Sequence, residues 1–431
     1  DLKNSPDHNT EGELSVTDVP VRTKLARAFL HAGVELGNRL VDYNGAGDQF
    51  GYSYVQANIK DGKRHSAAKA FLHSHKRRKN LHILQDATAT KVNIDPKTKA
   101  AYSVDYVLNG LSYTVRARRE IILSAGPIAS PQLLMLSGVG PKEHLEDIGI
   151  PVIKDLPVGE TLYDHISFMG LTFLINQTGI GFVEKDHKNA HSILNWLQYG
   201  DNAITSIGGV EALAYIKTNA SKEIGDYPDI ELIFVGGSLN SDDGESIRKG
   251  IGMTDDFYNE VFREIDSKES WSAIPMLLHP KSKGWLELRD KNPFHWPKMH
   301  GRYLMHPQDI ASLVASIRYI IRLSETNAFQ KFGSRLHKRH FPTCLNYAFG
   351  TDDYWECAVR SVTATLHHQI ATCKMGPKSD PTAVVDPELR VYGIKNLRVV
   401  DSSIIPRPTT AHTNAPAIMI AEKAADLIRR T

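Results

Sequence analysis

Cysteine is scarce in this chain. The 431 residues include three cysteines, Cys344, Cys357 and Cys373, which are too few for a fold held together by disulfides. None of them forms a CxxC pair, so the spacing typical of a structural zinc site is absent as well. One disulfide bridge remains possible, and the candidate pair is Cys344 and Cys357.

An excess of charge of one sign is also lacking. The 51 Lys and Arg residues nearly balance the 49 Asp and Glu residues, and the net charge is +2. Bulk electrostatics therefore gives no argument for nucleic-acid binding. The basic run at 76–79 is more typical of a solvated loop, and the missing G-x-S-x-G sequence disfavours a serine hydrolase.

Long apolar segments are missing too. The run from Ile121 to Gly140 carries no charge over 20 residues, but it contains Pro127, Pro131 and three glycines. These residues interrupt a membrane helix, so the run predicts a buried strand, a turn and a helix. We expect no transmembrane segment.

The first residues contain no recognisable leader. The chain opens with DLKNSPDHNTEGEL, without an initiator Met, a basic region or an apolar region, so no signal peptide is visible. We interpret this start as lying within a longer protein. The triplets Asn176-Gln-Thr and Asn219-Ala-Ser permit N-glycosylation, and we expect a secreted, extracellular protein.

Globular composition accompanies these absences. Hydrophobic residues make up 41% and charged residues 23%, as is ordinary for folded domains, and the length allows two to three of them. Strand patterns occupy 81–118, with Asn109-Gly110 as a two-residue hairpin turn. A buried strand at 120–125 then precedes a helix for which we predict Ser130 as cap and Pro131 as first residue.

The middle of the chain has a different pattern. Strand-like runs at 171–175, 229–237, 273–279 and 284–290 predict an antiparallel sheet, and the apolar periodicity at 307–324 predicts a helix. The fold class is therefore α/β combined with α+β.

The C-terminal stretch combines a strand, a polar turn and a helix. Leu397, Val399 and Val400 form an apolar run that ends at Asp401, and a helix begins near Asn414, which we expect to cap it. The N-terminus of such a helix carries about half a positive charge and can stabilise an anion beside it. His412 lies just before the N-terminus of this helix. An imidazole at such a position is suited to proton or hydride chemistry.

A second group of histidines occurs in LHHQIATCKMG. If His368 and His412 face one cavity, they supply a base and a hydrogen-bonding partner for a hydroxyl group. Zinc binding is the competing interpretation. It would use His295, His300 and His306, or His73 and His75. No carboxylate or Cys accompanies either set in a local ligand pattern, so we expect no metal.

Several motifs resemble one family. GPIASPQLLMLSGVG at 126–140 resembles the second signature of the glucose-methanol-choline (GMC) oxidoreductases at each constrained position. The segments that support it are VGETLYDH at 158–165, HPKSKGWLEL at 279–288, HHQIATCKMG at 367–376, VVDSS, and HTNAPAIMIAEKAAD near the end. The resemblance covers essentially the whole chain and is closest to the FAD-dependent, quinone-reducing glucose dehydrogenase branch.

The resemblance implies a flavoenzyme that oxidises an alcohol or sugar hydroxyl by hydride transfer to FAD, with quinone or oxygen as electron acceptor. His368 matches the catalytic histidine of the family and His412 its second active-site residue. The positions implied to contact FAD are Ala89, Asp401, Ser402, Thr413, Asn414 and Ala415. An FAD-binding, Rossmann-like domain and an antiparallel-sheet substrate domain are implied as well.

The same resemblance divides the chain into four segments. Residues 1–63 are an N-terminal remnant of helix and loops, 64–165 part of the FAD-binding domain, 166–365 the substrate domain, and 366–431 an active-site segment that returns to the FAD-binding domain.

The chain also departs from the family pattern. The first strand of the family and its GxGxxG turn do not occur in this sequence and would lie before Asp1. We therefore interpret the N-terminal FAD-binding βαβ unit as missing. We therefore expect an incomplete FAD-binding domain, and a fragment that binds FAD poorly and is inactive alone. Ala371 replaces the usual Gly and Thr161 the usual Asn. A non-catalytic paralogue that has lost flavin is the alternative.

Overall fold

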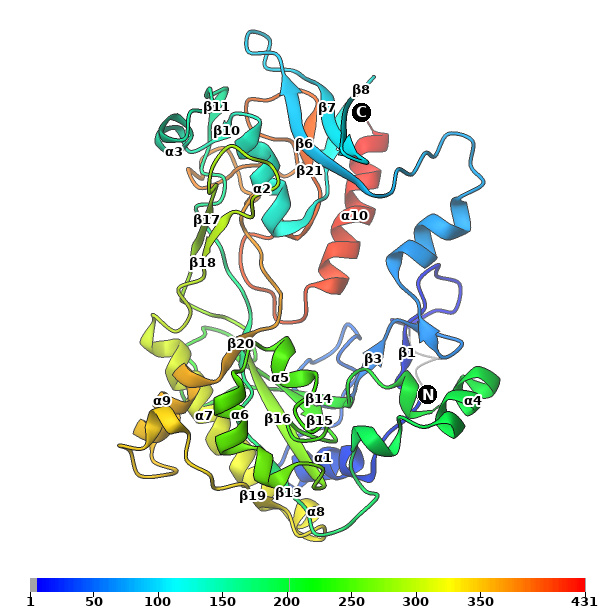
Figure 1. Cartoon of the computed structure of the whole chain (residues 1–431), viewed down its shortest axis with the longest axis vertical. Helices are drawn as coiled ribbons and strands as arrows, with labels where there is room; N and C mark the ends of the chain where they lie inside the picture. Colours follow the sequence, from blue (N-terminus) through cyan, green and yellow to red (C-terminus); the bar gives the residue numbers. More distant parts are fainter. Residues whose placement is uncertain (1–5, 201, 431) are drawn as a thin grey trace. The chain divides into compact units, whose positions relative to one another are not determined.

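The chain folds into two compact units, which are described separately. A computed structural model describes residues 6–200 and 202–430 (Figure 1). The sheet unit comprises the residues up to 82 together with 166–278 and 307–365. The α/β unit comprises 83–165, 279–306 and the residues from 366 onward. The four-segment division stays a prediction, and its first and last segments include residues 1–5 and 431, which lie outside the described residues.

An eight-stranded antiparallel sheet organises the sheet unit. Its strand order is β19-β13-β16-β15-β14-β2, with β12 pairing to β16 and β20. The strands are β2 (Gly51–Tyr54), β12 (Ile166–Phe168), β13 (Phe173–Leu174), β14 (Val210–Ile216), β15 (Ile230–Val235), β16 (Ser270–Leu277), β19 (Arg335–Leu336) and β20 (Thr363–Thr365). The antiparallel sheet expected from the middle of the chain is confirmed for three of the four predicted runs, which form β13, β15 and β16. The fourth run, at 284–290, instead forms β17 (Trp285–Glu287), which pairs with β18 (Lys298–His300) in the α/β unit. The sheet also includes β2, β12, β14, β19 and β20, which we did not predict.

Aromatic side chains join this sheet to its helices. The ring of Phe29 in α1 (Lys24–Glu35) lies 4.8 Å from that of Phe234 in β15. Trp271 in β16 stacks on Phe329 of α8 (Asn327–Gln330) with the ring centroids 4.0 Å apart. The predicted helix at 307–324 is confirmed as α7 (Pro307–Ser324), whose apolar positions face the core.

Shorter elements complete the sheet unit. The helices are α4 (Ala190–Tyr199), α5 (Ile247–Gly250), α6 (Asp255–Val261) and α9 (Asp352–Ser361), and the strands are β1 (Thr17–Asp18), β3 (Gln56–Ala57), β4 (Ile59–Lys60) and β5 (Lys63–Arg64).

A three-stranded meander opens the α/β unit. It consists of β6 (Ala87–Ile94), β7 (Ala101–Leu108) and β8 (Leu111–Arg116). The predicted hairpin at Asn109-Gly110 is confirmed, since both residues have positive φ angles, 52° and 77°, as a tight turn of this kind requires. The strand expected at 81–85 is wrong: no described strand pairs with this segment, so a strand there would leave its backbone groups unpaired.

A parallel strand pair and two helices form the centre of this unit. β9 (Ile121–Leu123) pairs with β21 (Leu397–Val399), and the chain continues from β9 into α2 (Gly126–Leu136) and from the β21 region toward α10 (Asn414–Arg429). The remaining elements are β10 (Val139–Gly140), α3 (Lys142–Asp147), β11 (Lys154–Asp155), β17 (Trp285–Glu287) and β18 (Lys298–His300).

The start of α2 corrects one prediction. The helix begins at Gly126, so Ser130 and Pro131 lie inside it and are not its cap and first residue. The Ser130 hydroxyl instead donates to Asp401 at 2.6 Å. Pro131 has no N–H for the carbonyl of Pro127, and that carbonyl accepts a hydrogen bond from Thr372 Oγ1 at 2.6 Å. Tertiary contacts thus compensate for a proline that local rules place at a helix start.

A disulfide bridge joins Cys344 to Cys357, as the sequence suggested. It connects the turn at 342–344 to α9, and its Cα atoms lie 5.8 Å apart. Cys373 is buried with a free thiol.

We expect the bridge to stabilise the sheet unit by about 3 kcal/mol, because it closes a loop of 13 residues and restricts the unfolded chain. Replacing both Cys344 and Cys357 by Ser should lower the urea midpoint by a corresponding amount. Wild-type protein treated with reductant should show the same loss. Equal midpoints for oxidised protein and the double variant would contradict this role.

Candidate active site

Three imidazole rings lie together in the α/β unit. The Nδ1 atoms of His165 and His368 are 3.0 Å apart. The rings of His368 and His412 have centroids 4.7 Å apart and are nearly perpendicular, at 80°. The predicted proximity of His368 and His412, which are 44 positions apart in the chain, is therefore confirmed. Their catalytic role stays a prediction.

The loop that carries His368 is held by the segment before His165. Tyr163 and Ile370 exchange backbone hydrogen bonds of 3.0 and 3.3 Å, and the amide of Leu366 donates to the carbonyl of His165 at 3.1 Å. His368 therefore lies on a short loop whose two ends are attached to one extended strand.

A buried carboxylate fixes the middle of this loop. Asp164 is 4% exposed, and its oxygens accept hydrogen bonds from the amide of His368 at 3.0 Å, from Gln369 Nε2 at 3.0 Å and from the hydroxyl of Tyr303 at 2.7 Å. A carboxylate that is removed from water requires such donors. The interactions tie the backbone of His368 to a fixed point.

The loop contains two residues in the left-handed region. His367 has a φ of 59° and Ala371 a φ of 71°. A side chain in this region costs roughly 1–2 kcal/mol, which glycine avoids. The family's usual glycine at the position of Ala371 thus has a conformational reason, and the buried alanine carries the strain here.

His368 is neutral at physiological pH. Burial lowers its pKa to about 3, and the neighbouring rings of His412, His165 and His367 add to this effect because a second positive charge nearby is unfavourable. A neutral imidazole keeps a lone pair that can accept a proton.

The helix after His412 begins one residue earlier than a cap at Asn414 requires. Thr413 is the cap position, and Asn414 is the first residue of α10, so the capping role predicted for Asn414 is wrong. Pro416 lies in the first turn, as expected. No acidic residue occupies this turn, so the partial positive charge of a 16-residue helix is not neutralised by a carboxylate there.

Asp401 has structural partners. Its carboxylate accepts hydrogen bonds from the amide of Gly126 at 3.0 Å, from the Ser130 hydroxyl and from the amide of Ser403 at 2.8 Å. These contacts join the end of β21 to the N-terminus of α2. Ser402 begins a short 3₁₀ turn just after it.

The other residues implied to contact FAD occupy two separate elements. Ala89 lies on β6, opposite Tyr106. Thr413 is half-buried, whereas Asn414 and Ala415 are exposed at the start of α10. The cofactor contacts of Ala89, Asp401, Ser402, Thr413, Asn414 and Ala415 stay predictions.

Sequence reasoning missed several residues around His368. VGETLYDH was recognised as a motif, but no role was given to Asp164 or His165, whose partners lie about 200 positions later. Tyr303 was not singled out at all. His279, within the recognised HPKSKGWLEL segment, lies 3.2 Å from Thr410 on the loop before His412.

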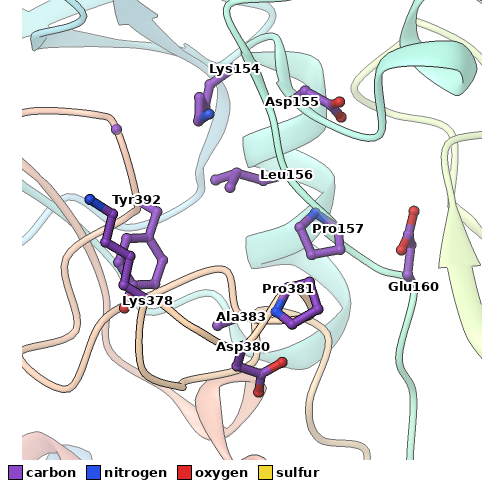
Figure 2. A pocket seen from close by; sticks show the side chains of 11 residues that line it. Lys154, Asp155, Leu156, Pro157, Glu160, Lys378, Asp380, Pro381, Ala383 and Tyr392 are labelled. Carbon is purple, nitrogen blue, oxygen red and sulfur yellow. The ribbon is translucent and has the colours of Figure 1, made fainter.

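A surface hollow of about 770 Å³ lies elsewhere in the α/β unit (Figure 2). None of the three clustered histidines lines it. Its lining includes Lys154 and Lys378 together with the acidic residues Asp155, Glu160 and Asp380, so its charges are mixed.

The described residues show neither a metal-ligand cluster nor a membrane-spanning helix. Among them, no group of three or more His, Cys, Asp or Glu side chains is arranged to hold a metal ion. Within the same part of the chain, none of the helices combines the length and apolar character needed to cross a bilayer.

Comparison with known proteins places the chain in a family. Two models of the GMC oxidoreductase family match the chain, one at residues 7–167 and the other at 280–421. The chain is 37% identical over 425 residues to glucose dehydrogenase (FAD, quinone) of Drosophila melanogaster, which covers 98% of this chain and 65% of that protein. It is 34% identical to alcohol dehydrogenase (acceptor) of Pseudomonas putida, covering 98% of this chain and 71% of that protein.

A solved structure agrees on the fold. Pyridoxine 4-oxidase from Mesorbium loti superposes with a TM-score of 0.78 at 24% identity, over 98% of this chain and 73% of that one. The chain belongs to the GMC oxidoreductase family. The predicted fold class, α/β combined with an antiparallel-sheet domain, is confirmed.

The comparisons also correct one interpretation. We inferred from the absent GxGxxG turn that the N-terminal unit of the family is missing, but the N-terminal family model matches residues 7–167, so this inference is wrong. The expectation of poor FAD binding loses that support. The chain spans 65% of the length of the Drosophila glucose dehydrogenase.

We expect His368 to make the chain sensitive to acid. Its pKa is about 3 when folded and 6.5 in the unfolded reference, so below pH 6.5 the unfolded chain binds more protons and the folded state loses stability. Thermal midpoints measured from about pH 7 down to about pH 5 should fall less for His368→Asn than for wild type.

His295→Asn provides the control, since this exposed histidine lies outside the cluster. Parallel curves for His368→Asn and wild type would contradict the assignment.

Proposed function

We propose that the protein carrying this chain oxidises an alcohol or sugar hydroxyl to a carbonyl group, with FAD as cofactor. The observation that carries the proposal is the pair His368 and His412, with ring centroids 4.7 Å apart. His412 lies two residues before Asn414, the first residue of α10. A neutral base and a second hydrogen-bonding ring suit a hydroxyl that loses its proton as its C–H bond breaks.

The residues at this place fit FAD. Asn414 and Ala415 are exposed in the first turn of α10, and this turn contains no acidic residue. The helix N-terminus favours negative charge. Bound FAD would supply the acceptor for the hydride that leaves the carbinol carbon. The relatives' names support this choice, since the Drosophila enzyme is named for FAD.

We assign the proton transfer to His368. Its ring is neutral, so it can accept the hydroxyl proton, and His412 can hold the same oxygen by a hydrogen bond. General-base assistance of this kind is worth roughly 10²- to 10⁴-fold in rate. Asp164 keeps the backbone of His368 in place during the transfer.

The substrate is proposed as a class. The relatives are named for glucose and for alcohols, so we propose a primary or secondary alcohol or a sugar. Quinone and oxygen are both proposed as electron acceptors, and anaerobic assays with each will separate them.

We further propose a secreted glycoprotein. The Cys344–Cys357 bridge is typical of oxidising compartments, and Asn176 and Asn219 of the two sequons are both exposed. A glycan at either position would meet solvent.

His412→Ala should lower kcat/KM for an alcohol substrate by roughly 10²-fold or more, because one of the two groups that hold the hydroxyl is lost. Stopped-flow bleaching of the yellow FAD-loaded protein under anaerobic conditions measures this step. Unfolding midpoints should match wild type, and His295→Ala, outside the cluster, should retain full rates. A colourless FAD-reconstituted preparation would reject the function, and undiminished bleaching by His412→Ala would remove its role.

Protein secreted from eukaryotic cells should lose mass on treatment with peptide N-glycosidase. Asn176→Gln and Asn219→Gln should each remove one glycan. An unchanged mass after treatment would reject the glycoprotein assignment, whereas the oxidation of alcohols would be unaffected.

A further inference from the structure

His165 has no role in the function proposed above, although its ring is in direct contact with His368. It is 2% exposed. Its Nδ1 atom lies 3.0 Å from the Nδ1 atom of His368, and the two rings meet edge to face at 87°. A buried histidine at this distance from a base is either a packing residue or a partner that controls the base.

The contact between the two Nδ1 atoms restricts where the protons lie. Two nitrogens at 3.0 Å share one hydrogen, carried by one ring and accepted by the lone pair of the other. In the first arrangement His368 donates from Nδ1 and has its lone pair on Nε2. In the second His165 donates, and neutral His368 carries its proton on Nε2.

Only the first arrangement gives His368 a basic nitrogen for the substrate. Its Nδ1 is occupied by His165 in both cases, so Nε2 is the nitrogen left to accept a hydroxyl proton. In the second arrangement Nε2 already bears a proton. The tautomer of His368 therefore decides whether the proposed proton transfer can occur.

The surrounding contacts keep the two rings at this distance. The carbonyl of His165 accepts from Leu366 and the carboxylate of the preceding Asp164 accepts from the amide of His368. The titratable side chains that act electrostatically on the His368 ring include His412, His165 and His367, and the carboxylate of Asp164 contacts its backbone amide. No carboxylate oxygen among the described contacts is bonded to that ring, so an imidazole takes the place that a carboxylate holds in a Ser-His-Asp triad.

We propose that His165 is a positioning residue that accepts the Nδ1 proton of His368 and so fixes the tautomer with a free lone pair on Nε2. When the hydroxyl proton moves to Nε2, the Nδ1 proton stays in place and the hydrogen bond to His165 stabilises the imidazolium. Neither histidine gains or loses another proton in this step, and the hydride leaves the carbinol carbon as in the function proposed above. The proposal rests on the proposed function, since it assigns a partner to the base used there.

The first test reads the tautomer without any turnover. Nitrogen-15 spectra of the imidazole rings, with the His368 signals assigned by their loss in His368→Gln, should show Nδ1–H for His368 in wild type. His165→Leu should shift this population toward Nε2–H. An Nε2–H tautomer in wild type, or identical spectra for His165→Leu, would overturn the proposal.

The second test separates hydrogen bonding from packing. His165→Leu should lower kcat by about 10- to 100-fold with little change in KM, as losing the partner that orients a histidine typically does. His165→Asn places an amide near the former Nδ1 position and should restore most of kcat. If both variants lose kcat equally while folded, the role is packing and the proposal fails.

A matched control lies outside the cluster. His295→Asn makes the same substitution at an exposed histidine, and it should keep kcat and the His368 tautomer. If His165→Leu does not fold, the His165→Asn spectrum decides, since loss of the Nδ1–H tautomer there would overturn the proposal and its retention would support it. If the FAD-reconstituted protein oxidises no alcohol, the proposed function fails, and the spectra still test the tautomer.

Discussion

The buried carboxylate of Asp164 is the constraint on which the candidate site depends. A charge that is 4% exposed must be satisfied inside the protein, and its donors are the backbone of His368 and the side chains of Gln369 and Tyr303. Because these donors come from segments far apart in the chain, satisfying one charge brings three segments together. The position of the His368 backbone follows from that requirement.

A second network secures the same unit around α2. Asp401 holds the first turn of this helix through Gly126 and Ser130, and Thr372 bonds the carbonyl that Pro131 leaves free. Thr372 lies two residues after Ile370, so the C-terminal side of the histidine loop is held both by the Tyr163–Ile370 pair and by α2. The left-handed Ala371 lies between these anchors, where surrounding contacts can maintain its strain.

Local rules predicted the elements whose determinants are local. The Asn109-Gly110 hairpin and the helix at 307–324 follow from turn chemistry and periodicity, and both were found. The predictions were wrong where a residue far away in the sequence determines the local structure. Residues 81–85 look like a strand but have no described strand to pair with, and Ser130 looks like a helix cap but bonds Asp401 within a longer helix. The proximity of His368 and His412 was predicted from motif resemblance, not from spacing.

The sequence by itself determined the family, the pair His368 and His412, and the alternation of a parallel strand–helix region with an antiparallel sheet, since these are recorded in motifs and periodicity. Only the tertiary structure decided that Asp164 and His165 contact His368, and that Asp401 and Thr372 support α2. The physical reason is that a buried polar group needs a partner, while a sequence shows the group without showing which distant residue satisfies it.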